Sequence, residues 1–130
     1  MTPATIDQLE RREIKAASAA LARAFDDSPL FMHLLPRACS RPSVLRSLFT
    51  ASIRDALPFE AVFAARRGSE ILGVAVWLPP GRYPPTAIRQ LKQLAGVLKL
   101  GPLAPRSVAP SLRYLRAVER AHPKADHWYL

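Results

Sequence analysis

The sequence predicts a single α/β (α+β) domain, from its length, its apolar content and the way its hydrophobic periodicity changes along the chain. The 130 residues include 49% hydrophobic and 22% charged side chains, which fits one globular domain with a core and argues against a disordered chain. No apolar run reaches the roughly 18 residues that a membrane span needs. Segments with the three-to-four spacing of helices alternate with short β-forming runs, in the order β-α-α-β-β-α-α-β.

The first half of the chain predicts one short strand followed by two helices. Residues Thr5–Leu9 are the candidate strand. Apolar residues then recur every three or four positions over Arg11–Asp27, which predicts an amphipathic helix that ends before a proline. A second helix is expected over Ser43–Leu57, with Ser43 as its N-cap. Between the two helices, the apolar cluster at residues 30–35 fits either a helical turn or a buried loop.

Two β-forming runs follow, and they predict an antiparallel hairpin. Phe59–Arg66 and Glu70–Leu78 are separated by the turn sequence Arg67-Gly68-Ser69. The second run is almost continuously apolar, which is typical of a central strand covered on both faces. It ends at two prolines and a glycine, which cannot continue a strand ladder.

The rest of the chain predicts two further helices and the beginning of a strand. Apolar spacing indicates a helix over residues 88–98, then a proline-interrupted linker, then a helix from Ser111 to about His122. The aromatic and apolar residues Trp128–Leu130 are typical of the start of a strand.

Two adjacent carboxylates, Asp26 and Asp27, are the acidic feature of the sequence that most suggests a binding role. At the C-terminal end of a helix they oppose the helix dipole, at a cost of about 0.3 to 1 kcal/mol. Two interpretations follow: a site that attracts a cationic amine, or a solvated pair that caps the next turn. Phe25 beside them and Trp77 near a strand end either line a cleft or pack in the core.

The residues alone assign no catalytic group and no metal site. The three histidines, His33, His122 and His127, match no metal-ligand spacing. We expect His122 and His127 to be polar surface residues in a loop. The five glycines are too widely spaced for a phosphate-binding loop.

The net charge of +9 comes almost entirely from the second half of the chain. The first sixty residues hold eight Lys/Arg against seven Asp/Glu, and the remaining seventy hold eleven against three. Between Arg82 and Arg120 the aromatic residues are Tyr83 and Tyr114 alone, too few for base stacking. We therefore interpret the excess as solvated basic helix faces. A small nucleic-acid binder is the weaker alternative, and its affinity would fall steeply with salt.

The N-terminal residues and the cysteine content favour a cytoplasmic protein. The chain lacks the basic-then-apolar order of a signal peptide at its start. Its one cysteine, Cys39, cannot form an internal disulfide.

Three segments in succession, ALARAFDDSPLF, ILGVAVWLPPG and ERAHPKADHWYL, resemble the GCN5-related N-acetyltransferase family. The resemblance runs from Ile6 to Leu130 in the expected order. It implies an acyl-CoA N-acyltransferase-like fold, a mixed, mostly antiparallel sheet with flanking helices, whose splayed central strands hold acetyl-CoA. Thr5–Leu9 and the hairpin resemble the first three strands, and Trp128–Leu130 would open the fourth.

The activity that the resemblance implies is transfer of an acetyl group from acetyl-CoA to a primary amine, on a small molecule or a peptide. Phe25, Asp26, Asp27 and Trp77 match the family regions that face this acceptor. Positioning of the amine beside the thioester would supply most of the catalysis, and a general base would deprotonate the ammonium group.

One family motif does not occur in these residues. It is an Arg/Gln-x-x-Gly-x-Gly/Ala loop after the fourth strand, whose backbone N–H groups hold the pyrophosphate, and it would follow Leu130. We therefore expect residues 1–130 to form a single incomplete acetyltransferase domain, about its N-terminal two-thirds, truncated in the fourth strand and inactive or very weak. The alternative is a non-catalytic interaction module that self-associates through the exposed sheet edge at Trp128–Leu130.

Overall fold

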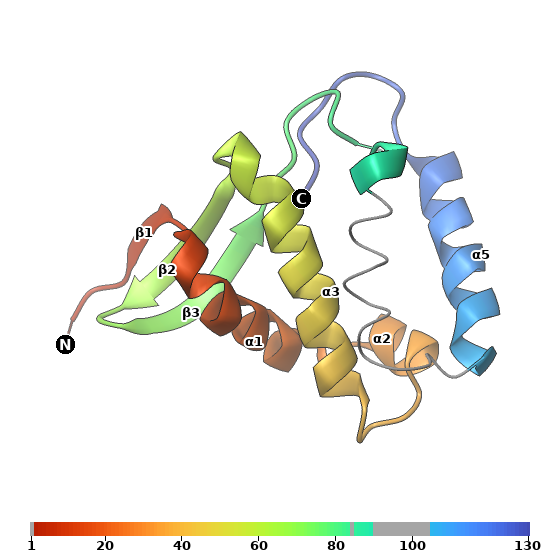
Figure 1. The fold of residues 1–130 in the computed structure, drawn as a ribbon, viewed down its shortest axis with the longest axis horizontal. Coiled ribbons are helices and arrows are strands. Elements are labelled where there is room, and N and C mark those ends of the chain that lie inside the picture. The colour runs from red at the N-terminus through yellow and green to blue at the C-terminus, as the bar shows by residue number, and fades with distance from the viewer. Residues whose placement is uncertain (1, 84, 90–104) are drawn as a thin grey trace.

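The computed structural model in Figure 1 describes residues 2–83, 85–89 and 105–130, which form a mixed α and β fold. Its sheet is antiparallel, with three strands in the order β1-β2-β3. The strands are β1 (Thr5–Gln8), β2 (Val62–Arg67) and β3 (Glu70–Val76). The helices are α1 (Ile14–Phe25), α2 (Pro29–Leu34), α3 (Arg41–Ala56) and α5 (Pro105–Ala121), with short 3-10 turns η1 (Arg11–Glu13) and η2 (Leu57–Phe59). In this described part, no helix is both long enough and apolar enough to cross a bilayer.

Helix α1 confirms the apolar periodicity of its sequence. Its buried residues, Ile14, Ala17, Ser18 and Ala22, follow the spacing of one helix face. The helix ends at Phe25, two residues before the predicted end.

Helices α2 and α3 differ in detail from the prediction. The apolar cluster at residues 30–35 is helical, with Pro29 in the first turn of α2. Ser43 is not an N-cap, because α3 begins two residues earlier, at Arg41. The second residue of α3 is Pro42, and proline is tolerated there because the first helical N–H groups have no partner within the helix.

The predicted hairpin is confirmed, although its first strand begins later than expected. Phe63 pairs with Ala75 and Ala65 with Gly73, and the register shifts after Ala65. Residues 57–59 form η2 instead of strand, and Glu60 then takes a left-handed conformation with φ of 54°. A left-handed residue cannot extend a ladder, so β2 starts only at Val62.

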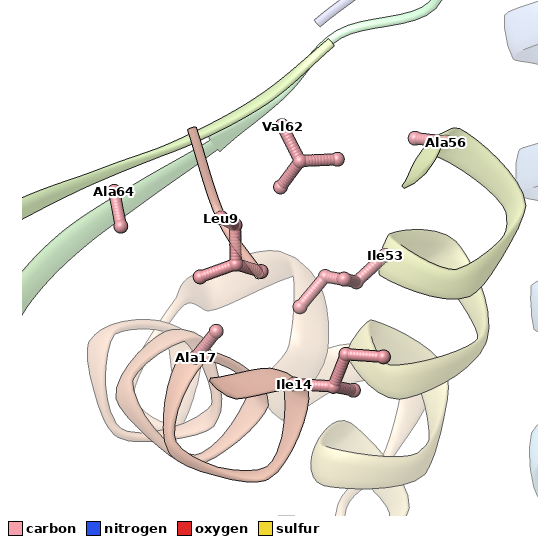
Figure 2. Close-up of a cluster of buried hydrophobic side chains, with 7 residues drawn as sticks. All are labelled: Leu9, Ile14, Ala17, Ile53, Ala56, Val62 and Ala64. Atoms are coloured by element: carbon pink, nitrogen blue, oxygen red, sulfur yellow. The ribbon is translucent and has the colours of Figure 1, made fainter. Parts of the chain in front are cut away.

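The largest core cluster lies between the sheet and helices α1 and α3 (Figure 2). Its buried members are Leu9, Ile14, Ala17, Ile53, Ala56, Val62 and Ala64. A second cluster, of Ala22, Leu34, Leu35 and Leu45, joins α1, α2 and α3.

The prediction that the second hairpin strand is covered on both faces is wrong for the described residues. No residue of β3 is fully buried, and Leu72 is 43% exposed. Val74 and Val76 pack against the core, because alternate side chains of a strand point to opposite faces. In Figure 2 the helices that pack on the sheet lie on one side of it. Ile71 also packs against this core, because the register shift after Ala65 leaves an extra residue on β3 and interrupts the alternation.

The last helix is longer than its sequence predicts. Helix α5 starts at Pro105, not Ser111, so the predicted linker is in part helical. Pro105 occupies the first helical position, where the ring is tolerated, and Pro110 lies inside the helix at the loss of one backbone hydrogen bond. Of the helix expected over residues 88–98, the structure describes 88 and 89 as helical, and the remainder lies outside the described residues.

Candidate functional site

The end of β3 is where the described structure brings the last residues of the chain against the sheet. The N–H of Leu78 donates to the carbonyl of Tyr129 at 2.7 Å, and the N–H of Tyr129 donates back at 3.0 Å. This reciprocal pair is an isolated antiparallel bridge. The strand start predicted at Trp128–Leu130 is thus a single paired residue beside β3, in the described residues.

Four rings pack together next to this bridge, and we call them the Tyr–His cluster: Tyr83, His122, His127 and Tyr129. The rings of Tyr83 and Tyr129 are stacked, with centroids 4.3 Å apart and an interplanar angle of 13°. His122 lies 4.2 Å from the Tyr83 ring and 4.6 Å from the His127 ring, between centroids. The cluster therefore joins the segment after β3, the end of α5 and the C-terminal residues.

Burial shapes the chemistry of the two phenols. The pKa of Tyr83 is raised, first by burial and then by the neighbouring Tyr129 and Glu119. Burial also raises the pKa of Tyr129. Both phenols therefore stay protonated well above neutral pH and can donate a hydrogen bond there.

His127 is held in one tautomer by the backbone. Its Nδ1 lies 2.6 Å from the carbonyl oxygen of Ala125. A carbonyl oxygen only accepts, so Nδ1 carries the proton, and the neutral ring presents Nε2 as a proton acceptor.

A small hollow of about 50 Å³, open to solvent, lies beside the Tyr–His cluster. It is lined by Gly81, Tyr83, His122, Pro123, Lys124, Ala125, Asp126 and His127. Ligand pockets usually measure about 300 to 1,000 Å³, so the hollow can take only part of a ligand. It nevertheless combines an ammonium, a carboxylate and two imidazoles. Within the described ranges, no group of three His, Cys, Asp or Glu side chains is placed to hold a metal ion.

An arginine clamp holds the segment after β3 against the end of α3. Arg89 donates to Asp55 through Nε, at 2.6 Å, and through Nη2. Its Nη1 donates to the Arg82 carbonyl at 2.7 Å. The ion pair with Asp55 raises the pKa of Arg89. The guanidinium groups of Arg82 and Arg89 also lie over the Phe59 ring, 5.1 and 5.3 Å from its centroid.

Phe25, one of the predicted acceptor residues, is part of an aromatic cluster at the end of α1. Its ring centroid lies 5.9 Å from that of Phe31 and 5.3 Å from that of Phe49. The side chain is nevertheless 40% exposed, so it both packs and faces solvent.

The two carboxylates after Phe25 have different surroundings. Asp26 is fixed by the buried Arg41, whose Nη1 donates to the Asp26 carbonyl at 3.0 Å and lies 3.9 Å from Oδ1. That Oδ1 is itself buried and accepts no hydrogen bond in the structure. Asp27 is exposed. Of the pair, Asp27 is the carboxylate that solvent and solutes reach most freely.

Trp77, the fourth predicted residue, directly precedes the bridge at Leu78. It is half-buried, and its N–H donates to the Ala61 carbonyl at 2.9 Å. Ala61 follows the C-terminal end of α3, whereas Asp26 contacts Arg41 at the start of that helix. Sixteen helical residues at about 1.5 Å each separate these ends by about 24 Å. The structure therefore places Trp77 next to the bridge at Leu78 and Asp26 at the start of α3, while Phe25 packs against Phe49 in the middle of that helix.

The sequence did not indicate the Tyr–His cluster. His122 and His127 were expected to be surface residues, but both are half-buried against aromatic rings. Tyr83 and Tyr129 are 46 positions apart, and no local spacing announces that they stack. The signal that was present is the concentration of His, Trp and Tyr in the last nine residues.

A comparison of the chain with protein-family models, with curated proteins and with solved structures finds no significant match in any of the three.

Proposed function

We propose that this chain belongs to an acetyl-CoA-dependent N-acetyltransferase that transfers an acetyl group to a primary amine. The observation that carries the proposal is the order of the elements around the sheet. Helices α1, α2 and α3 lie between β1 and β2, β2 and β3 form a hairpin, and after α5 the chain returns to pair Tyr129 beside β3. The resemblance to the N-acetyltransferase family implies strands in this order, with Trp128–Leu130 opening the fourth.

The groups around the bridge supply the chemistry that an amine acceptor needs. An amine is protonated at neutral pH and must lose a proton before it attacks a thioester. The free Nε2 of His127 is a suitable acceptor of that proton, directly or through water. The protonated phenols of Tyr83 and Tyr129 are hydrogen-bond donors close by. Acetyl-CoA, when bound, supplies the thioester.

The acceptor surface that we propose begins at Trp77 and the hollow beside the Tyr–His cluster. Asp26, with Asp27 beside it, can belong to the same surface only for a long acceptor, because Asp26 contacts the start of α3, about 24 Å along that helix from the end near Trp77. Phe25 packs against Phe49, midway between the two ends. A peptide could span that distance, whereas a small amine would contact one end alone.

The test is acetyl transfer by the purified chain. It is incubated with radiolabelled acetyl-CoA and a panel of small amines and peptides, and acetylated products are identified by mass spectrometry. We expect weak transfer, above the rate without protein, which falls at least tenfold in His127→Ala. The matched control is His33→Ala, an exposed histidine in α2. Absence of transfer by the folded chain at saturating acetyl-CoA would favour the non-catalytic module described next, and equal transfer in His127→Ala and His33→Ala would contradict the role of His127.

One observation favours a second candidate, a non-catalytic module that associates with itself through the sheet. The N–H of Trp77 points toward β2, and Leu78 bonds on the other side to Tyr129. By alternation, the backbone groups of Val74 and Val76 point to this same outer edge, where the described residues give them no partner. Unpaired strand edges pair with other chains. Light scattering after size-exclusion chromatography distinguishes the two candidates, since a stable dimer without transfer activity favours the module.

A further inference from the structure

Helix α5 carries two exposed leucines between its half-buried side and a row of exposed arginines. Leu112 is 49% exposed and Leu115 is 55% exposed. They are three positions apart, so they lie on the same face of the helix. Single exposed apolar residues are common, but two adjacent ones on a helix that also carries a charged row form a patch.

The half-buried side of α5 lies next to the leucines. Ser111 and Val118 are half-buried there. Just beyond the helix, His122 packs against Tyr83 and Tyr129. Leu115 is four positions from Ser111 and three from Val118, so the leucines lie at the edge of the half-buried side, and the arginines lie farther round the helix.

A row of arginines runs beside the leucines. Arg113, Arg116 and Arg120 are spaced by three and four positions and are all exposed. In the part of the chain that the structure describes, none of them belongs to an ion pair. Glu119 is the acidic residue of this surface. We call these three arginines, together with Leu112 and Leu115, the Leu–Arg face.

The chemistry of the Leu–Arg face decides between its possible occupants. A phosphate backbone would pair with the arginines but would leave both leucines without an apolar partner. A second α5 would bring two rows of arginines together, and like charges at an interface are costly. A lipid surface is a poorer match, because membrane binding grows with the apolar area that a helix buries, and the apolar part of this face consists of two partly exposed leucines.

We propose that the Leu–Arg face binds an acidic amphipathic helix of another protein. The partner would place apolar residues, three or four positions apart, over Leu112 and Leu115. Its Glu or Asp residues would flank that apolar row and pair with Arg113, Arg116 and Arg120. This is the helix-recognition mode in which apolar anchors give affinity and charges fix the orientation. One helix against another buries less surface than a standard interface, so the complex is transient, with a micromolar Kd.

The experiment uses two designed peptides of about twenty residues and the full 130-residue chain. Both peptides place leucines three and four positions apart; one has glutamates beside the leucine row and the other has lysines. Fluorescence anisotropy of the labelled peptides measures binding. We expect a micromolar Kd for the glutamate peptide, rising as salt is added, and binding of the lysine peptide at least tenfold weaker.

Two variants locate the site and one controls for the loss of a surface leucine. Leu115→Gln and Arg116→Glu should each weaken binding of the glutamate peptide about tenfold. Leu72→Gln, at a leucine of similar exposure on β3, should leave it unchanged. Circular dichroism establishes whether each variant is folded. If Leu115→Gln does not fold, Arg116→Glu alone locates the binding site.

The same variants are measured against phosphatidylserine vesicles and a single-stranded oligonucleotide. Tighter binding of either than of the glutamate peptide would overturn the proposal. So would equal loss of peptide binding in Leu115→Gln and Leu72→Gln, or no binding of the glutamate peptide at millimolar concentration.

Discussion

Arg41 is a buried cation at the first position of α3, and its replacement by alanine should destabilise the fold markedly. Its guanidinium joins three backbone carbonyls: Nε donates to Leu35 at 2.8 Å, Nη1 to Asp26 at 3.0 Å, and Nη2 to Pro36 at 3.4 Å. These bonds hold together the end of α1 and the segment that leads into α3. Removal of the side chain leaves the carbonyls to find water or remain unpaired.

The expected loss can be worked out bond by bond. The Leu35 carbonyl belongs to a buried residue, and an unsatisfied buried acceptor costs about 1 to 3 kcal/mol. The bond to Asp26 adds about 1 kcal/mol, and that to Pro36 adds little, because Pro36 is exposed and water can replace the guanidinium. A cation at a helix N-terminus opposes the dipole, so about 0.5 kcal/mol is regained. Arg41→Ala should therefore lower the free energy of unfolding by about 1.5 to 3.5 kcal/mol.

Urea unfolding followed by circular dichroism measures this difference. Arg46→Ala, an exposed position of the same helix, is the matched control and should change stability by less than about 0.5 kcal/mol. Arg41→Lys keeps the charge without the planar set of donors and should fall between the two. If Arg41→Ala loses no more than Arg46→Ala, the three carbonyl bonds do not stabilise the fold, and the reasoning is refuted.

Three further predictions concern the Tyr–His cluster, an ion pair and the hairpin turn. Tyr83→Ala removes the ring stacked on Tyr129. It should speed hydrogen exchange of the Tyr129 amide about tenfold, which corresponds to a loss of about 1.4 kcal/mol in the free energy of local opening. Tyr83→Phe keeps the ring and should leave the exchange rate unchanged. The hydrogen bond from Arg66 lowers the pKa of Glu13 below its ordinary value of 4.5. The ion pair therefore stabilises the fold above pH 4.5, and this stabilisation is lost as the pH falls through the lowered pKa. Urea midpoints measured from neutral to acidic pH should decline less steeply in Glu13→Gln than in the unchanged protein. Gly68 has a φ of 61°, so Gly68→Ala should lower the free energy of unfolding by about 1 kcal/mol. Gly73 has an ordinary φ and no atom within 4 Å of an added Cβ, so Gly73→Ala should leave the stability almost unchanged. Equal effects of the two substitutions would argue against the left-handed turn.

Local sequence patterns predicted an element correctly where neighbouring residues alone decide its structure. The apolar spacing of α1 and the turn sequence between β2 and β3 each depend on neighbours within a few positions, and both were confirmed. The start of α3 at Arg41 was missed, because two signals for a helix start lie next to each other. Ser43 is a typical N-cap residue, whereas Pro42 is typical of the first turn, and the structure follows the proline. The start of β2 was missed because the left-handed Glu60 is not a preference of glutamate and follows from how η2 meets the strand.

The candidate site was predicted only in part. Trp77 adjoins the paired residues Leu78 and Tyr129, as a residue at a strand end can be expected to. The corner at Asp26 was singled out for its charge, but its main structural partner is Arg41, 15 positions away. No periodicity predicts such a pairing.

By itself, the sequence determined the class of the fold, the hairpin and the buried face of α1, because these depend on hydrophobic spacing and turn residues within one segment. Only the tertiary structure decided that Tyr83, His122, His127 and Tyr129 meet at the end of β3. It also decided that Asp26 meets Arg41 at the start of α3, whereas Trp77 bonds to Ala61 beyond the end of that helix. Contacts between distant segments are set by how helices and strands pack to bury their apolar faces. That packing depends on all the elements together, so no single stretch of the sequence contains it.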